Sequence, residues 1–484
     1  MTTIDRRKFL KLSGGTAGGA VIGSTFLQAL GAAAGAQSGE AKGRAPRPAR
    51  ALQDSSYGPL APVPDQRGVE VLALPTGFSY VTLSRTGNTM ADGTSVPRNH
   101  DGMAAFAGPR GRGSVRLIRN HENRNRPGDL TATVMGPEHT RYDPLGGGGT
   151  TSIDYDPVSK RFRDFVSLNG TIVNCAGGIA YRKVGWITCE ETVAGPAQGW
   201  SKPHGYCFLV PVEANGPVPA APLKAMGRFA HEAVSHDPRT GFIYETEDSG
   251  NDSGFYRFRP ADRADLTAGG TLEVLAVAGQ PNYNTLTGQT EGQALPVRWI
   301  PIDDPDPDIE GGAPEVAAQG VARGAALFNR LEGIWFDRQD RSFFFASTSG
   351  GDAGYGQIWN YKPGTEVLRL FFESPGGSVL DSPDNLLVTP RGGILLCEDD
   401  ASGADNDTHP LAPGIVDVNR LIGIEVRARA EAFEFAVNRL NDSEFAGACF
   451  SPDGEVLFVN IFGNASPDSG MTCAITGPWG NGPL

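Results

Sequence analysis

Short apolar and β-branched runs, separated by turns, dominate the chain from residue 66 onwards. No long stretch shows the apolar period of 3.6 residues that marks an amphipathic helix. Clusters of Gly, Pro, Asp and Asn bound the short runs instead, and this pattern favours strands joined by turns. We expect strands at 114–119, 151–155, 185–189, 206–210, 241–245, 255–259, 342–347, 357–361, 367–372, 394–398, 420–426 and 456–461.

Several of these runs share one local pattern. Residues 237–244, 337–345 and 451–459 each place an acidic turn before an apolar strand, and a second strand often follows. Repetition at irregular intervals of tens of residues is typical of propeller blades. We therefore expect an all-β protein with a β-propeller fold, which would gather distant residues at its central channel. A pair of β-sandwiches is the competing architecture, but it needs a second linker, and none is evident.

Two other stretches are expected to lie outside the regular strands. Residues 261–325 are rich in Gly, Ala, Asp and Pro and suggest a long insertion. The run of four glycines at 146–149 resembles a phosphate loop, but it lacks the lysine of G-x-x-x-x-G-K-[ST]. We interpret it as a turn that precedes the strand at 151–155.

The N-terminus has the features of an export signal. Asp-Arg-Arg-Lys-Phe-Leu-Lys at 5–11 resembles the twin-arginine motif, and an A-x-A-like cleavage site follows at 34–36. We expect a twin-arginine signal peptide at 1–36, a flexible linker at 37–65 and a single propeller domain at 66–484. The expected partner in export is the twin-arginine translocase, and the expected location is periplasmic or extracellular.

Composition limits the possible partners. The chain has 484 residues, including 65 Gly and 36 Pro, which suits a turn-rich β protein. A net charge of −13 argues against binding to nucleic acid or anionic membranes. The six cysteines include no C-x-x-C pair, so a zinc ribbon is not expected. We expect a monomer whose cysteines are mostly reduced and buried.

Acidic residues recur beside the expected strand ends, where carboxylates are normally depleted. A buried carboxylate must be paired or bound to a cation, so their recurrence suggests several metal ions. Cys175, flanked by small residues, is either a thiolate ligand or an apolar core cysteine. Glu190 and Glu191 end a strand, and because neighbours alternate in direction, only one of them can enter a shared site.

Further acidic clusters point to calcium. Residues 245–248 and 398–400 are rich in carboxylates, and calcium prefers six to eight oxygen ligands. No H-E-x-x-H occurs, which argues against a zinc protease. Arg330 lies two residues before Glu332, a spacing that places both side chains on one face of a strand. This pair is either a phosphate clamp beside bound cations or a simple ion pair.

Taken together, these motifs resemble the PhoX-type alkaline phosphatase family over roughly residues 65–475. The matching segments are Asn-Cys-Ala-Gly-Gly at 174–178, Trp-Ile-Thr-Cys-Glu-Glu at 186–191, Gly-Arg-Phe-Ala-His-Glu at 227–232, Arg-Leu-Glu-Gly at 330–333, Asp-Asn-Leu at 384–386 and Cys-Glu-Asp at 397–399. The twin-arginine leader also fits this family.

The resemblance implies a six-bladed propeller with two iron ions and two or three calcium ions at one end of the channel. It implies hydrolysis of phosphate monoesters, and of diesters as an extension, from small phosphorylated substrates. Arg330 would be the catalytic residue that holds the phosphate, and Cys175 would bridge the irons. The implied metal ligands are Cys175, Glu191, Glu232, Glu332, Glu398 and Asp399.

The chain departs from the family pattern at 179–186, where a basic pair, Arg182 and Lys183, replaces the usual Thr-Pro-Trp-Gly-Thr-Trp stretch. We expect this pair to reshape the rim of the substrate site. Two alternative functions remain open: a calcium-dependent lactonase-like hydrolase, and a non-catalytic binding propeller. Metal content would separate them, because a lactonase of this kind needs calcium without iron.

Overall fold

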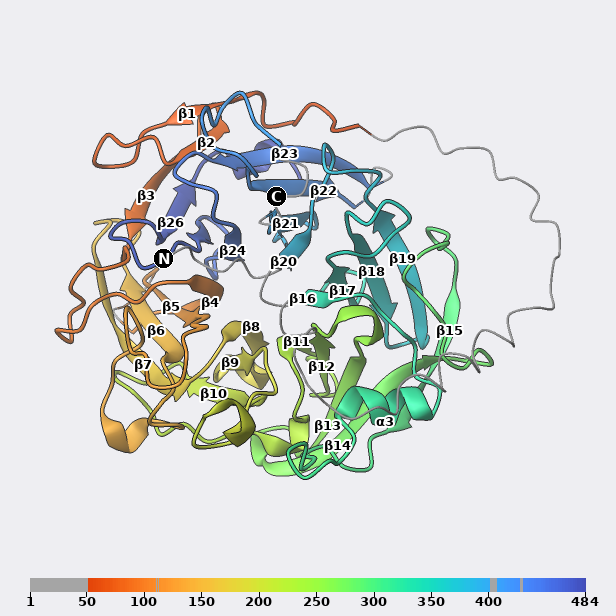
Figure 1. The fold of residues 1–484 in the computed structure, drawn as a ribbon. Coiled ribbons are helices and arrows are strands. Elements are labelled where there is room, and N and C mark those ends of the chain that lie inside the picture. The colour runs from red at the N-terminus through yellow and green to blue at the C-terminus, as the bar shows by residue number, and fades with distance from the viewer. Residues whose placement is uncertain (1–50, 110, 112, 401–406, 427–429) are drawn as a thin grey trace.

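The computed structural model describes residues 51–109, 111, 113–400, 407–426 and 430–484. The expected signal peptide at 1–36 lies outside these residues. Within them the protein is all-β, with one short α-helix, α3 (Val316–Ala322), and several single-turn 3₁₀ helices. The described strands form five sheets arranged around a central axis, so the expected β-propeller fold is confirmed and the sandwich pair is wrong (Figure 1).

Two sheets come from the first half of the chain. One contains, in spatial order, β4 (His100–Ala107), β5 (Val115–His121), β6 (Gly148–Tyr155) and β7 (Phe162–Thr171). The next contains β8 (Asn174–Ile179), β9 (Gly185–Glu190) and β10 (Cys207–Pro211).

A nine-stranded sheet follows. Its first part contains β11 (His231–His236), β12 (Ile243–Glu247), β13 (Phe255–Asp262), β14 (Asp265–Val277) and β15 (Leu295–Pro301). Through β15 it joins β19 (Val367–Glu373), β18 (Gln357–Lys362), β17 (Ser342–Ser347) and β16 (Leu331–Asp337). β11 and β16 are therefore the two ends of this sheet.

The last two sheets include N-terminal strands. One contains β1 (Leu60–Val63), β2 (Leu72–Pro75), β23 (Glu431–Asn438), β22 (Arg420–Glu425), β21 (Ile394–Glu398) and β20 (Pro383–Val388). The other contains β24 (Phe445–Phe450), β25 (Leu457–Ile461), β26 (Met471–Thr476) and β3 (Ser79–Leu83).

The innermost strands close a ring around the axis (Figure 1). β4 contacts β8, β8 contacts β11, β11 contacts β16, β16 contacts β20, β20 contacts β24, and β24 returns to β4. The antiparallel pairing of β26 with β3 links the end of the chain to its beginning. This pairing makes closure of the ring depend on both chain ends.

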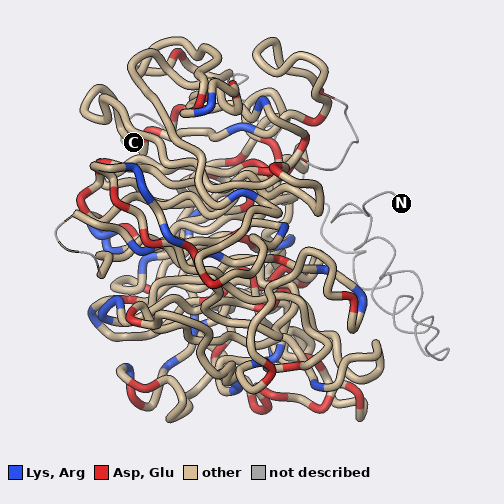
Figure 2. Tube along the Cα trace, turned by 90° about the vertical axis from the view of Figure 1, so that its left-hand side faces the viewer, with Lys and Arg blue, Asp and Glu red and all other residues tan. Residues whose placement is uncertain are grey.

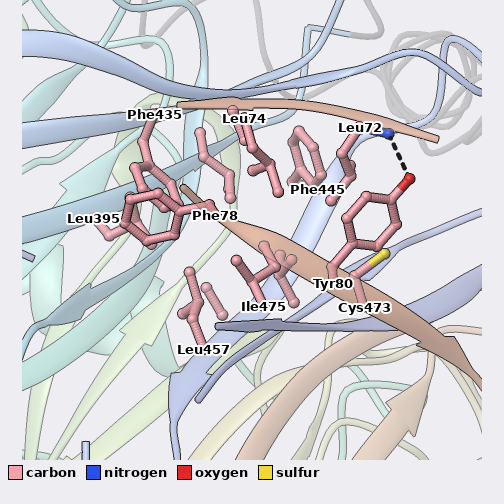
Figure 3. Packing of buried hydrophobic residues seen from close by; sticks show 14 of the residues in the cluster. Leu72, Leu74, Phe78, Tyr80, Leu395, Phe435, Phe445, Leu457, Cys473 and Ile475 are labelled. Atoms are coloured by element: carbon pink, nitrogen blue, oxygen red, sulfur yellow. Dashed lines mark hydrogen bonds between the residues drawn. The ribbon is translucent and has the colours of Figure 1, made fainter. Parts of the chain in front are cut away.

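A hydrophobic cluster fills the space between the last two sheets (Figure 3). Leu72 from β2, Tyr80 from β3, Leu395 from β21 and Ile475 from β26 all contribute to it. The backbone N–H of Leu72 donates a hydrogen bond to the Tyr80 hydroxyl at 3.1 Å. Each fully buried large apolar side chain contributes roughly 1.5–3 kcal/mol, so this cluster holds the ring closed.

Every strand expected from the sequence overlaps an observed one, and β17 and β21 have the expected bounds. β17 is buried on both faces because neighbouring sheets cover it, so its sequence is continuously apolar rather than alternating. The acidic turns are present too. In the turn between β16 and β17, the Asp337 carboxylate accepts a hydrogen bond from the backbone N–H of Gln339 at 2.8 Å.

Two expected boundaries differ from the structure. The expected linker at 37–65 overlaps folded chain, because β1 pairs with β2 and Tyr57 is buried in the cluster just described. The expected insertion at 261–325 is wrong, since it contains β14, β15 and α3. The first half of β14 is largely exposed, so it lacks the apolar pattern that marks a strand.

All six cysteines are unbridged and buried, as the sequence led us to expect. Basic and acidic positions are interspersed over the view in Figure 2, so the negative charge is not carried by one segment. Among the described residues, no helix is long and apolar enough to cross a membrane.

Candidate metal centre

The innermost strands all begin at the same end of the ring, and the second residues of five of the six form a circle of potential ligands. These residues are Asp101 in β4, Cys175 in β8, Glu232 in β11, Glu332 in β16 and Asp384 in β20. In each strand the pairing register shifts across this residue, which indicates a β-bulge. Bulges re-aim side chains, so the same local device places all five donors.

A second circle comes from the residues that follow the next strand of each sheet. Glu122 follows β5, Glu191 follows β9, Asp248 follows β12 and Asp399 follows β21. The backbone N–H of each donates to the carbonyl of the residue before the neighbouring innermost strand, at 2.9–3.1 Å. This shared hydrogen bond fixes each carboxylate beside the first circle.

The two circles meet in overlapping groups whose donor atoms lie within 4.8 Å of one another. Asp101, Glu122 and Cys175 form one group, and Cys175, Glu191 and Glu232 form the next. Two further groups continue the cluster: Glu191 with Asp248 and Glu332, and Glu232 with Glu332 and Asp384. The structure therefore brings together four of the six expected metal ligands: Cys175, Glu191, Glu232 and Glu332.

This donor set fits bound cations. All eight side chains are buried, with at most 5% of each residue exposed. Burying so many carboxylates together is very costly unless cations balance their charge. The thiolate with two carboxylates around Cys175 suits a transition metal such as iron. The groups formed only by carboxylates suit calcium.

Arg330 lies at the edge of the cluster, in the left-handed region at φ 44° and immediately before β16. Its guanidinium donates to both carboxylate oxygens of Asp248, at 3.0 and 2.8 Å, and to Glu332 at 3.2 Å. About 13% of the Arg330 side chain remains exposed, so the guanidinium borders both the buried carboxylates and solvent.

Arg124 is a second arginine at this site, which sequence reasoning missed. Its guanidinium contacts both Glu122 and Glu191, and 18% of its side chain is exposed. Arg124 and Arg330 thus border the cluster through different sheets. Arg124 carries no sequence signal of its own beyond lying two residues after Glu122.

Glu398 and Asp399 occupy different environments. The Glu398 carboxylate accepts hydrogen bonds from the Arg420 guanidinium at 2.7 and 2.8 Å and from the backbone N–H of Asp381 at 2.8 Å. It is therefore held in a buried ion pair with Arg420, outside the groups just described. Asp399 is buried and occupies the position in its sheet that Glu191 occupies in its own.

Sequence reasoning also missed Asp101, Glu122, Asp248 and Asp384 as individual ligands. For three of them a signal existed. Glu122 and Asp248 stand in acidic motifs at strand ends like that of Glu191, and Asp384 lies in the Asp-Asn-Leu motif. Asp101 had none, because its role depends on the bulge in β4 and on packing with distant strands.

Small residues follow several ligands of the first circle, and they let the innermost strands approach one another closely. A Cβ on Gly102 would lie 2.5 Å from the Ala176 Cα, and one on Gly333 would lie 2.8 Å from the Leu386 nitrogen. Beyond this narrow section, at Gly102 and Gly333, the channel opens into a cavity of about 830 Å³ at the far ends of the innermost strands. Arg182 and Lys183 line that cavity. The departure at 179–186 thus lies beside this cavity, and whether it reshapes the rim of the substrate site stays a prediction.

The fold and this cluster define the protein as a β-propeller with a buried candidate metal-binding site at one end of its channel. The profile of the alkaline phosphatase PhoX family matches residues 55–163 and 157–464, which is most of the chain. The chain belongs to this family and is a metal-dependent phosphoric ester hydrolase.

One solved structure supports the fold, and two others show a weaker likeness. Pseudomonas fluorescens PhoX, in complex with the transition-state analogue vanadate, is 17% identical with a TM-score of 0.61, over 89% of this chain and 98% of that one. A luciferin-regenerating enzyme is 10% identical with a TM-score of 0.38, over 83% and 96% of the two chains. A gluconolactonase from Xanthomonas campestris is 11% identical with a TM-score of 0.36, over 90% and 99%. The last two likenesses are too low to support an inference, and no curated protein matches the chain.

Proposed function

We propose that this protein hydrolyses phosphate monoesters, and diesters more slowly, at a mixed iron and calcium centre formed by the two circles of ligands. The observation that carries this proposal is the convergence of Cys175 with seven buried carboxylates from four of the five sheets. The proposal assigns the family's phosphatase activity to particular residues and metal ions of this chain.

The donor chemistry supports a division of roles. Cys175, Glu191 and Glu232 would hold iron, with the thiolate between two groups and thus able to bridge two ions. Asp248, Glu332 and Asp384, with Asp399 nearby in the ring, would hold calcium. When bound, such ions supply Lewis-acid polarisation of a phosphoryl oxygen and an activated oxygen nucleophile. Glu398 would brace the fold through Arg420 instead of binding metal.

Arg330 would orient the substrate. Asp248 and Glu332 hold its guanidinium at the open edge of the cluster, where its planar fork matches two phosphoryl oxygens. Hydrogen bonds to these oxygens strengthen as negative charge develops in the transition state. Arg124 would act similarly beside Glu122 and Glu191.

Three further expectations belong to this proposal. The strand order supports six blades if the nine-stranded sheet is divided where β15 meets β19. The twin-arginine motif at 5–11 supports export by the twin-arginine translocase to the periplasm or beyond. We expect the mature protein to act as a monomer on small phosphorylated substrates.

The test is turnover of p-nitrophenyl phosphate by natively purified, metal-loaded protein, together with elemental analysis. We expect an iron-to-protein ratio of about two and loss of most activity in Glu191→Ala and Glu332→Ala, since each removes a ligand. Glu273→Ala is the matched control, because Glu273 is a buried carboxylate paired with Arg257 away from the centre. Unchanged activity in both ligand variants would refute the proposal, and calcium without iron would favour a lactonase-like hydrolase.

A further inference from the structure

A second cluster of ligand-type side chains lies outside the four groups of the metal centre. It contains Cys207 of β10, His231 of β11 and Glu245 of β12, whose donor atoms lie within 4.8 Å of one another. None of the three has any exposed surface. The cluster shares no residue with the four groups described for the metal centre. The cluster is therefore distinct from the site that contains Glu232.

The spacing of these atoms fits a small, four-coordinate ion. His231 Nδ1 lies 3.5 Å from Cys207 Sγ and 3.3 Å from a carboxylate oxygen of Glu245. Cys189, directly opposite Cys207 in the β9–β10 pair, places its Sγ 3.6 Å from Cys207 Sγ. Tetrahedral zinc, with bonds of about 2.0–2.3 Å to N, O and S, separates its donors by roughly 3.3–3.8 Å.

The orientation of His231 is that of a metal ligand. Its Nε2 lies 3.1 Å from the Gly227 carbonyl oxygen, to which it can donate its proton. That hydrogen bond leaves the Nδ1 lone pair directed at Cys207 and Glu245. Histidines that bind metal through one ring nitrogen normally donate the other N–H to a backbone carbonyl or carboxylate. The ring is also fixed by stacking on Phe229, with centroids 3.6 Å apart.

Glu245 is the residue of this cluster whose burial costs the most free energy, because a carboxylate loses its hydration there. Its cross-strand neighbours are Val234 and Tyr256, and its carboxylate contacts His231 Nδ1 at 3.3 Å, which is longer than a normal hydrogen bond. A carboxylate this deep needs a cation to offset the loss of hydration.

We propose that Cys207, His231 and Glu245 bind a structural zinc ion, with Cys189 as the fourth ligand. Sulfur and imidazole donors select zinc over calcium, which takes oxygen ligands. Four protein donors without solvent access describe a structural site rather than a catalytic one. The ion would fix the start of β11 and thereby the position of Glu232. This inference stands independently of the proposed phosphatase mechanism.

Zinc content of the full chain, purified without chelator, tests the proposal. We expect about one zinc per protein in the wild type, and its loss in Cys207→Ser and Glu245→Gln. Cys473→Ser is the matched control, because Cys473 is a buried cysteine in the cluster between the last two sheets. Absence of zinc from the wild type, or equal zinc in the wild type and Cys207→Ser, would overturn the proposal.

Cobalt substitution distinguishes this site from the metal centre. Cobalt bound here should show thiolate-to-metal charge-transfer absorption that disappears in Cys207→Ser but persists in Cys175→Ser. The reverse pattern would assign the thiolate signal to the metal centre alone and refute the zinc site. Thiol titration of the unfolded protein is the second check, since a Cys189–Cys207 disulfide would also refute it. If Cys207→Ser does not fold, the signal in Cys175→Ser decides the question.

Discussion

Glu190 and Glu191 are adjacent in the chain, yet their carboxylates serve different parts of the molecule. Glu190, the last residue of β9, accepts hydrogen bonds from His204 at 2.7 Å and from the backbone N–H groups of Ile172 and Gly205 at 3.0 and 2.9 Å. Glu191 instead lies with Cys175 and Glu232 in the metal centre. The alternation of side chains along a strand separates a structural carboxylate from a functional one.

This separation predicts opposite consequences for two conservative substitutions. Glu191→Gln should lower iron content and reduce kcat by roughly 100-fold or more, with little loss of stability, because a metal ligand is removed. Glu190→Gln should retain metal but lower the free energy of unfolding by about 1.5–3 kcal/mol, since hydrogen bonds to a buried charge are lost. Elemental analysis, phosphatase kinetics and urea unfolding measure the two effects. Loss of iron in both variants to the same extent would contradict the separation.

Arg330 offers a second prediction, based on geometry rather than charge. Arg330→Lys keeps the positive charge but cannot form the two-pronged contact that Arg330 makes with Asp248. We expect kcat/KM for p-nitrophenyl phosphate to fall by roughly 10²–10³-fold, as for the loss of one transition-state hydrogen-bond donor. Arg257→Lys, which alters a bidentate-type pair with Glu273 outside the centre, is the control. Equal activity of Arg330→Lys and wild type would show that Arg330 does not contact the phosphoryl group.

The sequence predicted the strands better than the site, for a physical reason. A run such as that of β17 carries its own signal, because local apolar residues form the strand and bury it. The ligands of the metal centre depend on contacts between sheets that are distant in sequence. Asp101 and Arg124 could not be found for this reason. Glu232 was expected only through a family motif, and Cys175 was left open between ligand and core cysteine until the family motif favoured a ligand. Glu398 was expected to be a ligand through the Cys-Glu-Asp motif, and its pairing with Arg420 was not foreseen, because the orientation of β21 relative to the channel cannot be derived from its sequence.

The close approach of the innermost strands at Gly102 gives a prediction about stability. Gly102→Val should lower the free energy of unfolding by about 1–3 kcal/mol, because even a Cβ at Gly102 would lie 2.5 Å from the Ala176 Cα. Displacement of Ala176 would also move its neighbour Cys175, so iron content should fall as well. Gly364→Ala is the control, since no atom lies within 4 Å of the added Cβ. Urea unfolding and elemental analysis test this prediction. If Gly102→Val has the stability and iron content of the wild type, the innermost strands can move apart at this position.

The buried His204 predicts that stability declines at alkaline pH. Burial alone would lower its pKa, but the charge of Glu190, the contact with Asp143 at 3.4 Å and the hydrogen bond to Glu190 raise the pKa of His204 to about 9. An unfolded histidine titrates near 6.5, so between about pH 6.5 and 9 only the folded state holds this proton. Stability from this group is therefore complete below about pH 6.5 and is lost as pH rises towards 9, by at most about 1.4 kcal/mol per pH unit.

Urea unfolding of wild type and His204→Asn at pH 7 and pH 9 measures this dependence. The wild type should lose more stability than the variant between the two pH values, because the variant has no imidazolium to deprotonate. His139→Asn controls for removal of a histidine, since His139 is exposed at the surface. The two pH values lie well above the titration range of ordinary carboxyl groups, so Asp143 remains ionised throughout. Parallel losses in wild type and His204→Asn would show that His204 does not carry an extra proton in the folded protein.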